Sequence, residues 1–160
     1  MKRITHVIFS SSLLIFCAKF FSFPFNIIEI FFIGLAAGYM QYIIDTLSHE
    51  VIRGYIRKGY YHRRTPLFHS PSGAIIIAII FTIPLYFALK HNPIEIFILM
   101  IISAFSHLLL DSITEHGIYV NGKRIWKKRI FSYNNPLLNT FFITISIIML
   151  IITLKNLIQI

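Results

Sequence analysis

The sequence predicts an all-α integral membrane protein, a bundle of about five transmembrane helices that forms a single domain over residues 1–160. Two observations carry this prediction: the apolar composition and the five apolar stretches described below. Hydrophobic residues make up 56% of the 160 residues and charged residues only 13%, and the mean hydropathy is +0.73. A soluble domain usually has about a quarter of its residues charged, so this composition excludes a disordered chain and argues against a soluble domain. The single cysteine excludes a disulfide framework and a cysteine-rich zinc finger.

Five stretches of the chain are candidates for membrane-spanning helices, each of which needs about 20 mainly apolar residues. They cover residues 4–21, 23–44, 73–89, 94–110 and 137–154. The first stretch follows two basic residues, as in a signal peptide, but bulky residues follow it in place of a small-residue cleavage site. We therefore interpret it as a span. Pro24 and Pro93 fall in the short connections, where turns are expected.

The distribution of Lys and Arg predicts the orientation of these spans. If the N-terminus is cytoplasmic, 12 of the 15 basic residues fall on the cytoplasmic side, and only Lys19, Lys90 and Lys155 fall on the other. Cytoplasmic loops of membrane proteins are enriched in Lys and Arg. The sequence therefore predicts a multi-pass protein of the cell membrane, with its N-terminus inside, its C-terminus outside, and two cytoplasmic loops at about residues 45–72 and 111–136.

The other ionisable residues gather on the same side of the predicted bundle. Six of the seven His residues and four of the six carboxylates fall there, although they come from different spans. Ionisable residues close to hydrocarbon are costly and tend to face one another. This distribution predicts one polar site at the cytoplasmic mouth of the bundle.

The spacing within this set indicates a metal site. His107 and Asp111 are four residues apart, and so are Asp45 and His49; residues at this spacing share one helix face. Neutral imidazole and carboxylate together suit zinc, and also manganese or iron. Asp45 and His49 are alternatively candidates for a catalytic base. The expected metal ligands are His6, Asp45, His69, His107 and Asp111.

The order of these motifs carries a family resemblance. The motifs are Thr5-His6, Asp45 to His49, His62-Arg63 to His69-Ser70, and His107 to Asp111 followed by Thr114 and Gly117. Over about residues 5–132 the chain resembles the YdjM-type bacterial inner-membrane proteins, described as membrane-bound metal-dependent hydrolases, and a related set of uncharacterised archaeal membrane proteins. It departs from that pattern at residues 45–49, where a tight Asp-x-Asp-His motif has lost one carboxylate. The resemblance implies a metal-binding membrane protein with hydrolase activity.

The leading functional hypothesis is a membrane-embedded, metal-dependent hydrolase. A metal-activated water would attack a phosphoester, such as that of a lipid, at the cytoplasmic interface, and Arg63 and Arg64 would bind the phosphate. The expected partners are membrane lipids and this substrate. We do not expect nucleic acid, because the aromatic residues of the basic loops are typical of an interfacial belt.

Two other classes of function stay open. One is a non-enzymatic scaffold that recruits a cytoplasmic partner through its basic loops. The other is a metal or proton transporter, which we rank last because transport needs ionisable groups near the middle of the membrane, and the middles of these spans have few.

Overall fold

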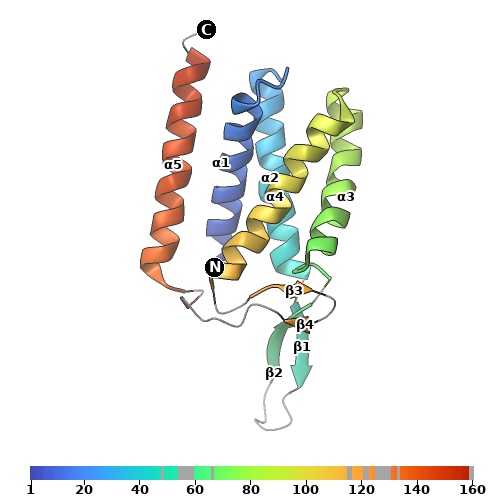
Figure 1. Ribbon diagram of the computed structural model, residues 1–160, viewed down its shortest axis with the longest axis vertical. Coiled ribbons are helices and arrows are strands. Elements are labelled where there is room, and N and C mark those ends of the chain that lie inside the picture. Colours follow the sequence, from blue (N-terminus) through green and yellow to red (C-terminus); the bar gives the residue numbers. More distant parts are fainter. Residues whose placement is uncertain are drawn as a thin grey trace.

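The computed structural model describes residues 1–47, 49–53, 60–65, 67–114, 117–120, 123–124, 131–132 and 134–158. In this part of the chain, helices form a bundle (Figure 1). The helices are α1 (Arg3–Phe20), α2 (Ile27–Leu47), α3 (Pro71–Leu89), α4 (Pro93–Ile113) and α5 (Pro136–Ile158). All five are long and apolar enough to cross a membrane. The predicted all-α, five-helix architecture is therefore confirmed.

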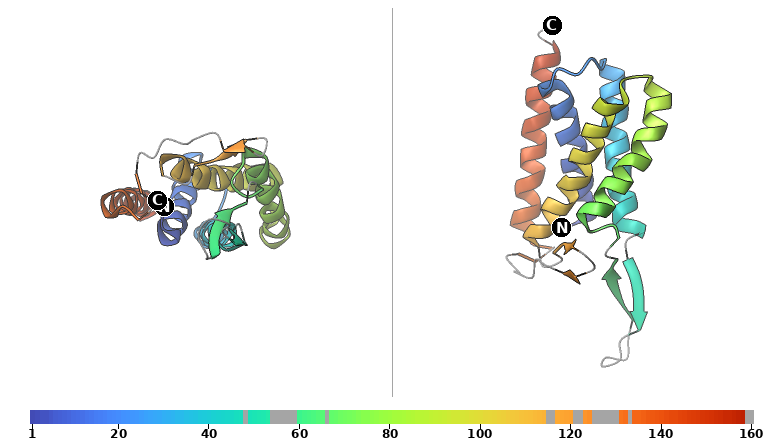
Figure 2. Two further views of the ribbon diagram at one scale, coloured as in Figure 1. Left: turned by 90° about the horizontal axis from the view of Figure 1, so that it is seen from below. Right: turned by 45° about the vertical axis from the view of Figure 1, so that its right-hand side comes forward.

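Helix α1 is central to the packing, because it contacts α2, α4 and α5, while α3 packs mainly on α4. Helix α5 lies at one edge of the bundle, beside α1 (Figure 2). Much of the interior is apolar, with fully buried side chains such as Leu14, Ile33 and Leu99. The outer faces are also apolar, as exposed Phe31 and Ile151 illustrate. Apolar residues on both the inner and the outer faces are expected for helices surrounded by lipid.

Two short antiparallel hairpins occupy the long loops. Strand β1 (His49–Arg53) pairs with β2 (Tyr60–Arg64), and β3 (Tyr119–Val120) pairs with β4 (Lys123–Arg124). Both hairpins lie at the end of the bundle where α1 begins, whereas the C-terminus lies at the opposite end (Figure 1). The sequence predicted these segments only as loops.

The start of α2 differs from the prediction because a polar cap determines it. Asn26 Oδ1 accepts hydrogen bonds from the main-chain N–H groups of Ile28 and Glu29, both at 3.0 Å. Glu29 Oε2 accepts one from Asn26 N–H at 2.7 Å. This reciprocal arrangement is a capping box. The helix thus begins at Ile27, not at residue 23 as predicted, and it continues to Leu47, so that Asp45 lies within its last turn.

Candidate metal centre

Side chains from four segments meet at the end of the bundle where α1 begins. His6 comes from the first turns of α1 and Asp45 from the last turn of α2, while His69 precedes α3. His107 and Asp111 come from the last two turns of α4. All five are buried, with at most 4% of any residue exposed. The structure thus brings together the five residues that the sequence predicted as metal ligands.

Asp111 lies at the centre of this cluster. Its Oδ1 atom is 3.3 Å from His6 Nε2, and its Oδ2 atom is 3.4 Å from His69 Nε2 and 3.3 Å from His107 Nε2. The main-chain nitrogen of Met1 is 3.4 Å from Oδ1. One carboxylate therefore faces three imidazole rings that come from three separate segments of the chain.

His107 joins the two halves of the cluster. Its Nε2 atom is 3.9 Å from Asp45 Oδ1, and its ring stacks on that of His6, with centroids 4.2 Å apart and planes inclined by 28°. Two groups of three residues have ligand atoms that lie within 4.8 Å of one another inside each group. One is His6, His107 and Asp111, and the other is Asp45, His69 and His107. Both groups contain His107, so the two candidate groups adjoin each other.

The separations between nitrogen and oxygen atoms in this cluster match those of ligand atoms around one ion. Four ligands placed tetrahedrally at about 2.0–2.1 Å from zinc lie about 3.3 Å from one another. A hydrogen bond between an imidazolium and a carboxylate is shorter, at about 2.7–2.9 Å. The distances of 3.3 and 3.4 Å around Asp111 are close to this separation between ligand atoms, so these side chains could hold a metal ion.

A tight turn before α3 positions His69. Ser70 caps α3 by accepting a hydrogen bond from Gly73 N–H at 3.1 Å, and Pro71 occupies the first helical position. Gly73 is required here because a Cβ atom at this position would lie 1.5 Å from the Leu67 carbonyl oxygen. The Nδ1 atom of His69, on the side of the ring away from Asp111, is 3.3 Å from the main-chain oxygen of Thr65, within hydrogen-bonding distance.

The end of α4 fixes Asp111 in a similar way. The Asp111 carbonyl oxygen accepts hydrogen bonds from the N–H groups of Thr114, at 3.1 Å, and Gly117, at 3.2 Å. Gly117 has a φ of 66°, a conformation that glycine adopts without steric cost. Tyr119 N–H then donates to the His69 carbonyl oxygen at 2.8 Å. The chain after α4 is thereby tied to the turn that carries His69.

Two polar residues that the sequence analysis missed lie next to the ligands. Gln41 is buried in α2, and its Oε1 atom is 2.8 Å from His107 Nδ1. Asn139 of α5 accepts a hydrogen bond from Thr5 Oγ1 at 2.7 Å, beside His6. Gln41 precedes Asp45 by four residues within an apolar span, and this spacing was the available signal.

The remaining predicted site residues belong to the β1–β2 hairpin. His49 pairs with Arg64 in the strand register, and Glu50 pairs with Arg63. Their side chains lie outside the part of the structure that is described. The roles predicted for His49 as a base, and for Arg63 and Arg64 in phosphate binding, stay predictions.

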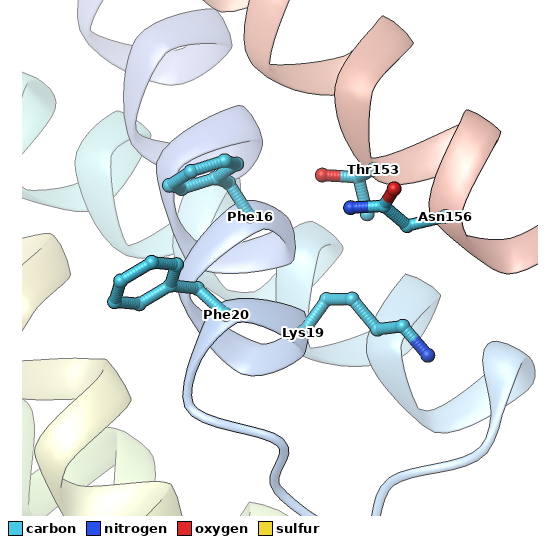
Figure 3. Close-up of a pocket in the computed structure, with 5 residues that line it drawn as sticks. All are labelled: Phe16, Lys19, Phe20, Thr153 and Asn156. Atoms are coloured by element: carbon cyan, nitrogen blue, oxygen red, sulfur yellow. The ribbon is translucent and has the colours of Figure 1, made fainter.

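The opposite end of the bundle offers a contrast. There His91 Nε2 is 3.0 Å from Glu29 Oε2, at a half-buried surface site. A pocket of 380 Å³ lies between α1 and α5, lined by Phe16, Lys19, Phe20, Thr153 and Asn156 (Figure 3). These lining residues include no imidazole, carboxylate or thiol, so they do not form a second candidate metal site.

The fold and the cluster define a class: a protein of membrane-type helices with a buried His/Asp centre suited to a metal ion. The chain belongs to the family described as "Protein of unknown function (DUF1286)", whose family model matches residues 1–110. This range includes four of the five cluster residues and ends one residue before Asp111. No curated protein and no solved structure matches the chain. The family found is thus an uncharacterised one, and the comparisons give no support for the YdjM-type hydrolase family.

Proposed function

We propose that this chain is a multi-pass protein of the cell membrane that binds a divalent metal ion in its His/Asp cluster and hydrolyses a phosphoester at the cytoplasmic interface. The observation that carries the proposal is the arrangement around Asp111, whose carboxylate oxygens lie 3.3 or 3.4 Å from three imidazole nitrogens. The proposed ligands are His6, Asp45, His69, His107 and Asp111.

The donor set favours zinc, with manganese or iron as alternatives. Three imidazoles and two carboxylates are ligands that all three metals accept, and zinc is the most common partner of such nitrogen-rich sites. Charge balance supports a divalent ion, whichever of the three metals it is. A divalent ion and the two carboxylates of Asp45 and Asp111 have no net charge, which reduces the cost of burying them.

Each side chain has a proposed part in the reaction. When bound, the ion would supply a water molecule whose pKa is lowered towards neutral. Asp111 would hold the ion, because its oxygens lie nearest the three imidazoles. Asp45, whose Oδ1 atom is 3.9 Å from His107 Nε2, would be either a further ligand or, in place of that role, the catalytic base, and His49 is the alternative base. Arg63 and Arg64 would bind the phosphate oxygens through charge-assisted hydrogen bonds.

The first test measures metal content in the full chain, purified in detergent without chelator. Wild-type protein should contain close to one zinc, manganese or iron ion per chain by elemental analysis. His107→Ala should lose most of it, because His107 belongs to both ligand groups. His91→Ala is the matched control, since His91 lies at the other end of the bundle beside Glu29, and this variant should keep the metal.

The second test measures hydrolysis of p-nitrophenyl phosphate and bis-p-nitrophenyl phosphate by the same preparations. Activity should fall in His107→Ala and persist in His91→Ala. Wild-type protein that stays metal-free after incubation with zinc, manganese and iron salts would overturn the metal site. Metal-loaded protein that cleaves neither ester, nor a phospholipid mixture, would overturn the hydrolase assignment and leave only metal binding.

A further inference from the structure

Gln41 has an unusual position for an amide side chain. It lies in the second half of α2, is fully buried, and contacts one ring of the proposed metal centre and two serines. Its Oε1 atom is 2.8 Å from His107 Nδ1. Its Nε2 atom is 2.9 Å from the Ser103 carbonyl oxygen, 3.0 Å from Ser103 Oγ and 3.0 Å from Ser10 Oγ.

These contacts determine which way the amide points. The Ser103 carbonyl oxygen only accepts hydrogen bonds, so the group 2.9 Å from it must donate, and the NH₂ end of Gln41 must lie there. The reversed amide would place two carbonyl oxygens against each other. The Oε1 atom therefore faces His107, and it only accepts. His107 Nδ1 must then carry the hydrogen of the 2.8 Å contact.

We infer that Gln41 is a positioning residue that fixes the tautomer of His107. A neutral imidazole protonated on Nδ1 has its lone pair on Nε2, and Nε2 is the atom that faces Asp45 and Asp111. Gln41 thus makes the cluster-facing nitrogen of His107 a metal ligand and not a proton donor. The role of this tautomer in metal binding rests on the proposed function. The tautomer itself does not depend on a bound ion.

Two neighbouring helices, α1 and α4, hold the amide of Gln41 in this orientation. Ser10 of α1 and Ser103 of α4 have hydroxyl oxygens 2.6 Å apart, and Ser106 Oγ donates to the Ser103 carbonyl oxygen at 2.7 Å. All of these groups are buried. Outer hydrogen bonds of this kind orient metal-ligating His residues, and their loss typically weakens metal binding by about 10–100-fold.

The tautomer is tested in metal-free, full-length protein with ¹⁵N-labelled His at about pH 8, where free imidazole is largely neutral. The His107 signals are assigned by their loss in His107→Ala. Wild-type protein should show the Nδ1–H form. Gln41→Leu, which has no hydrogen-bonding atoms, should shift His107 towards a mixture of tautomers; Gln41→Met replaces it if Gln41→Leu does not fold.

Zinc affinity gives the second readout, by competition with a chelator. Gln41→Leu should bind zinc about 10–100-fold more weakly. Ser146→Ala is the matched control, because it removes a buried hydroxyl that donates within α5 to the Phe142 carbonyl oxygen, and the His107 tautomer should be unchanged. An Nε2–H tautomer in wild-type protein, or an unchanged tautomer in the Gln41 variant, would overturn the inference. A fixed Nδ1–H tautomer in protein that binds no metal would instead overturn the proposed function alone.

Discussion

A single carboxylate organises the cluster at the scale of residues. Asp111 and His107 are one helical turn apart, so their contact follows from their spacing in the sequence. The other two rings that face Asp111 come from residues 6 and 69, and no spacing rule connects those positions. Their convergence was predictable only through topology, because all of these residues fall at the ends of their spans that are predicted to face the cytoplasm.

Asp111→Asn should abolish high-affinity metal binding. The substitution keeps the size of the side chain but removes the charge that faces the rings of His6, His69 and His107. We expect zinc binding at least about 100-fold weaker, since loss of a ligand costs no less than loss of an outer hydrogen bond. Competition with a chelator measures this change.

Glu29→Gln is the matched control for Asp111→Asn. It also neutralises a carboxylate that faces a His ring, but at the opposite end of the bundle, beside His91. This variant should bind zinc like the wild type. Equal zinc affinities in wild type and Asp111→Asn would show that Asp111 is not a ligand, whatever the control does.

Gln41 illustrates the limit of reasoning from the sequence at this scale. The ligands were recognisable because His and Asp are rare in spans and carry metal chemistry. An amide is not a typical metal ligand, and the only signal that the sequence offered for Gln41 was its spacing of four residues from Asp45. Only its 2.8 Å contact with His107, which depends on how α2 and α4 face each other, reveals its role.

Hydropathy predicted the elements well but not their ends. It placed all five helices, because a span of about 20 apolar residues is a strong signal. It started α2 at residue 23 because Phe23 and Phe25 are apolar, whereas the capping box at Asn26 sets the true start at Ile27. The hairpins in the loops were missed because basic residues interrupt the alternation of apolar and polar side chains that marks a strand.

The turn before α3 leads to a prediction at the scale of elements. In Gly73→Ala the new Cβ would lie 1.5 Å from the Leu67 carbonyl oxygen, so the turn carrying His69 must shift. We expect a loss of stability of about 1–3 kcal/mol and weaker zinc binding. Thermal unfolding in detergent, with and without zinc, measures both effects.

Gly34→Ala in α2 serves as the control for this prediction. Its Cβ would meet Ile15 Cδ1 at 2.8 Å and Ile15 Cγ1 at 2.9 Å, and both atoms belong to one side chain that can move, not to the backbone. Alanine also favours the helical conformation over glycine by about 1 kcal/mol, so the net change should be small. If both variants were equally stable and bound zinc equally well, the turn would not be what positions His69.

The whole molecule has an asymmetry that connects topology to function. Five helices place the two termini at opposite ends (Figure 1). The cluster and both hairpins lie at one of these ends, which is also the end where 12 of the 15 basic residues are predicted. Because basic residues concentrate on the cytoplasmic side of membrane proteins, we propose that the cluster faces the cytoplasm.

Cysteine labelling in intact cells tests this orientation. In a Cys17→Ser background, Lys90→Cys places a thiol in the exposed turn between α3 and α4, and Asn134→Cys places one in the exposed loop before α5. A membrane-impermeant maleimide should label position 90 in intact cells, and position 134 only after the cells are permeabilised. The reverse pattern would place the His/Asp cluster at the outer surface. The proposed phosphoester would then have to be extracytoplasmic, because a buried centre at the end of a bundle is reached from the side on which its loops lie.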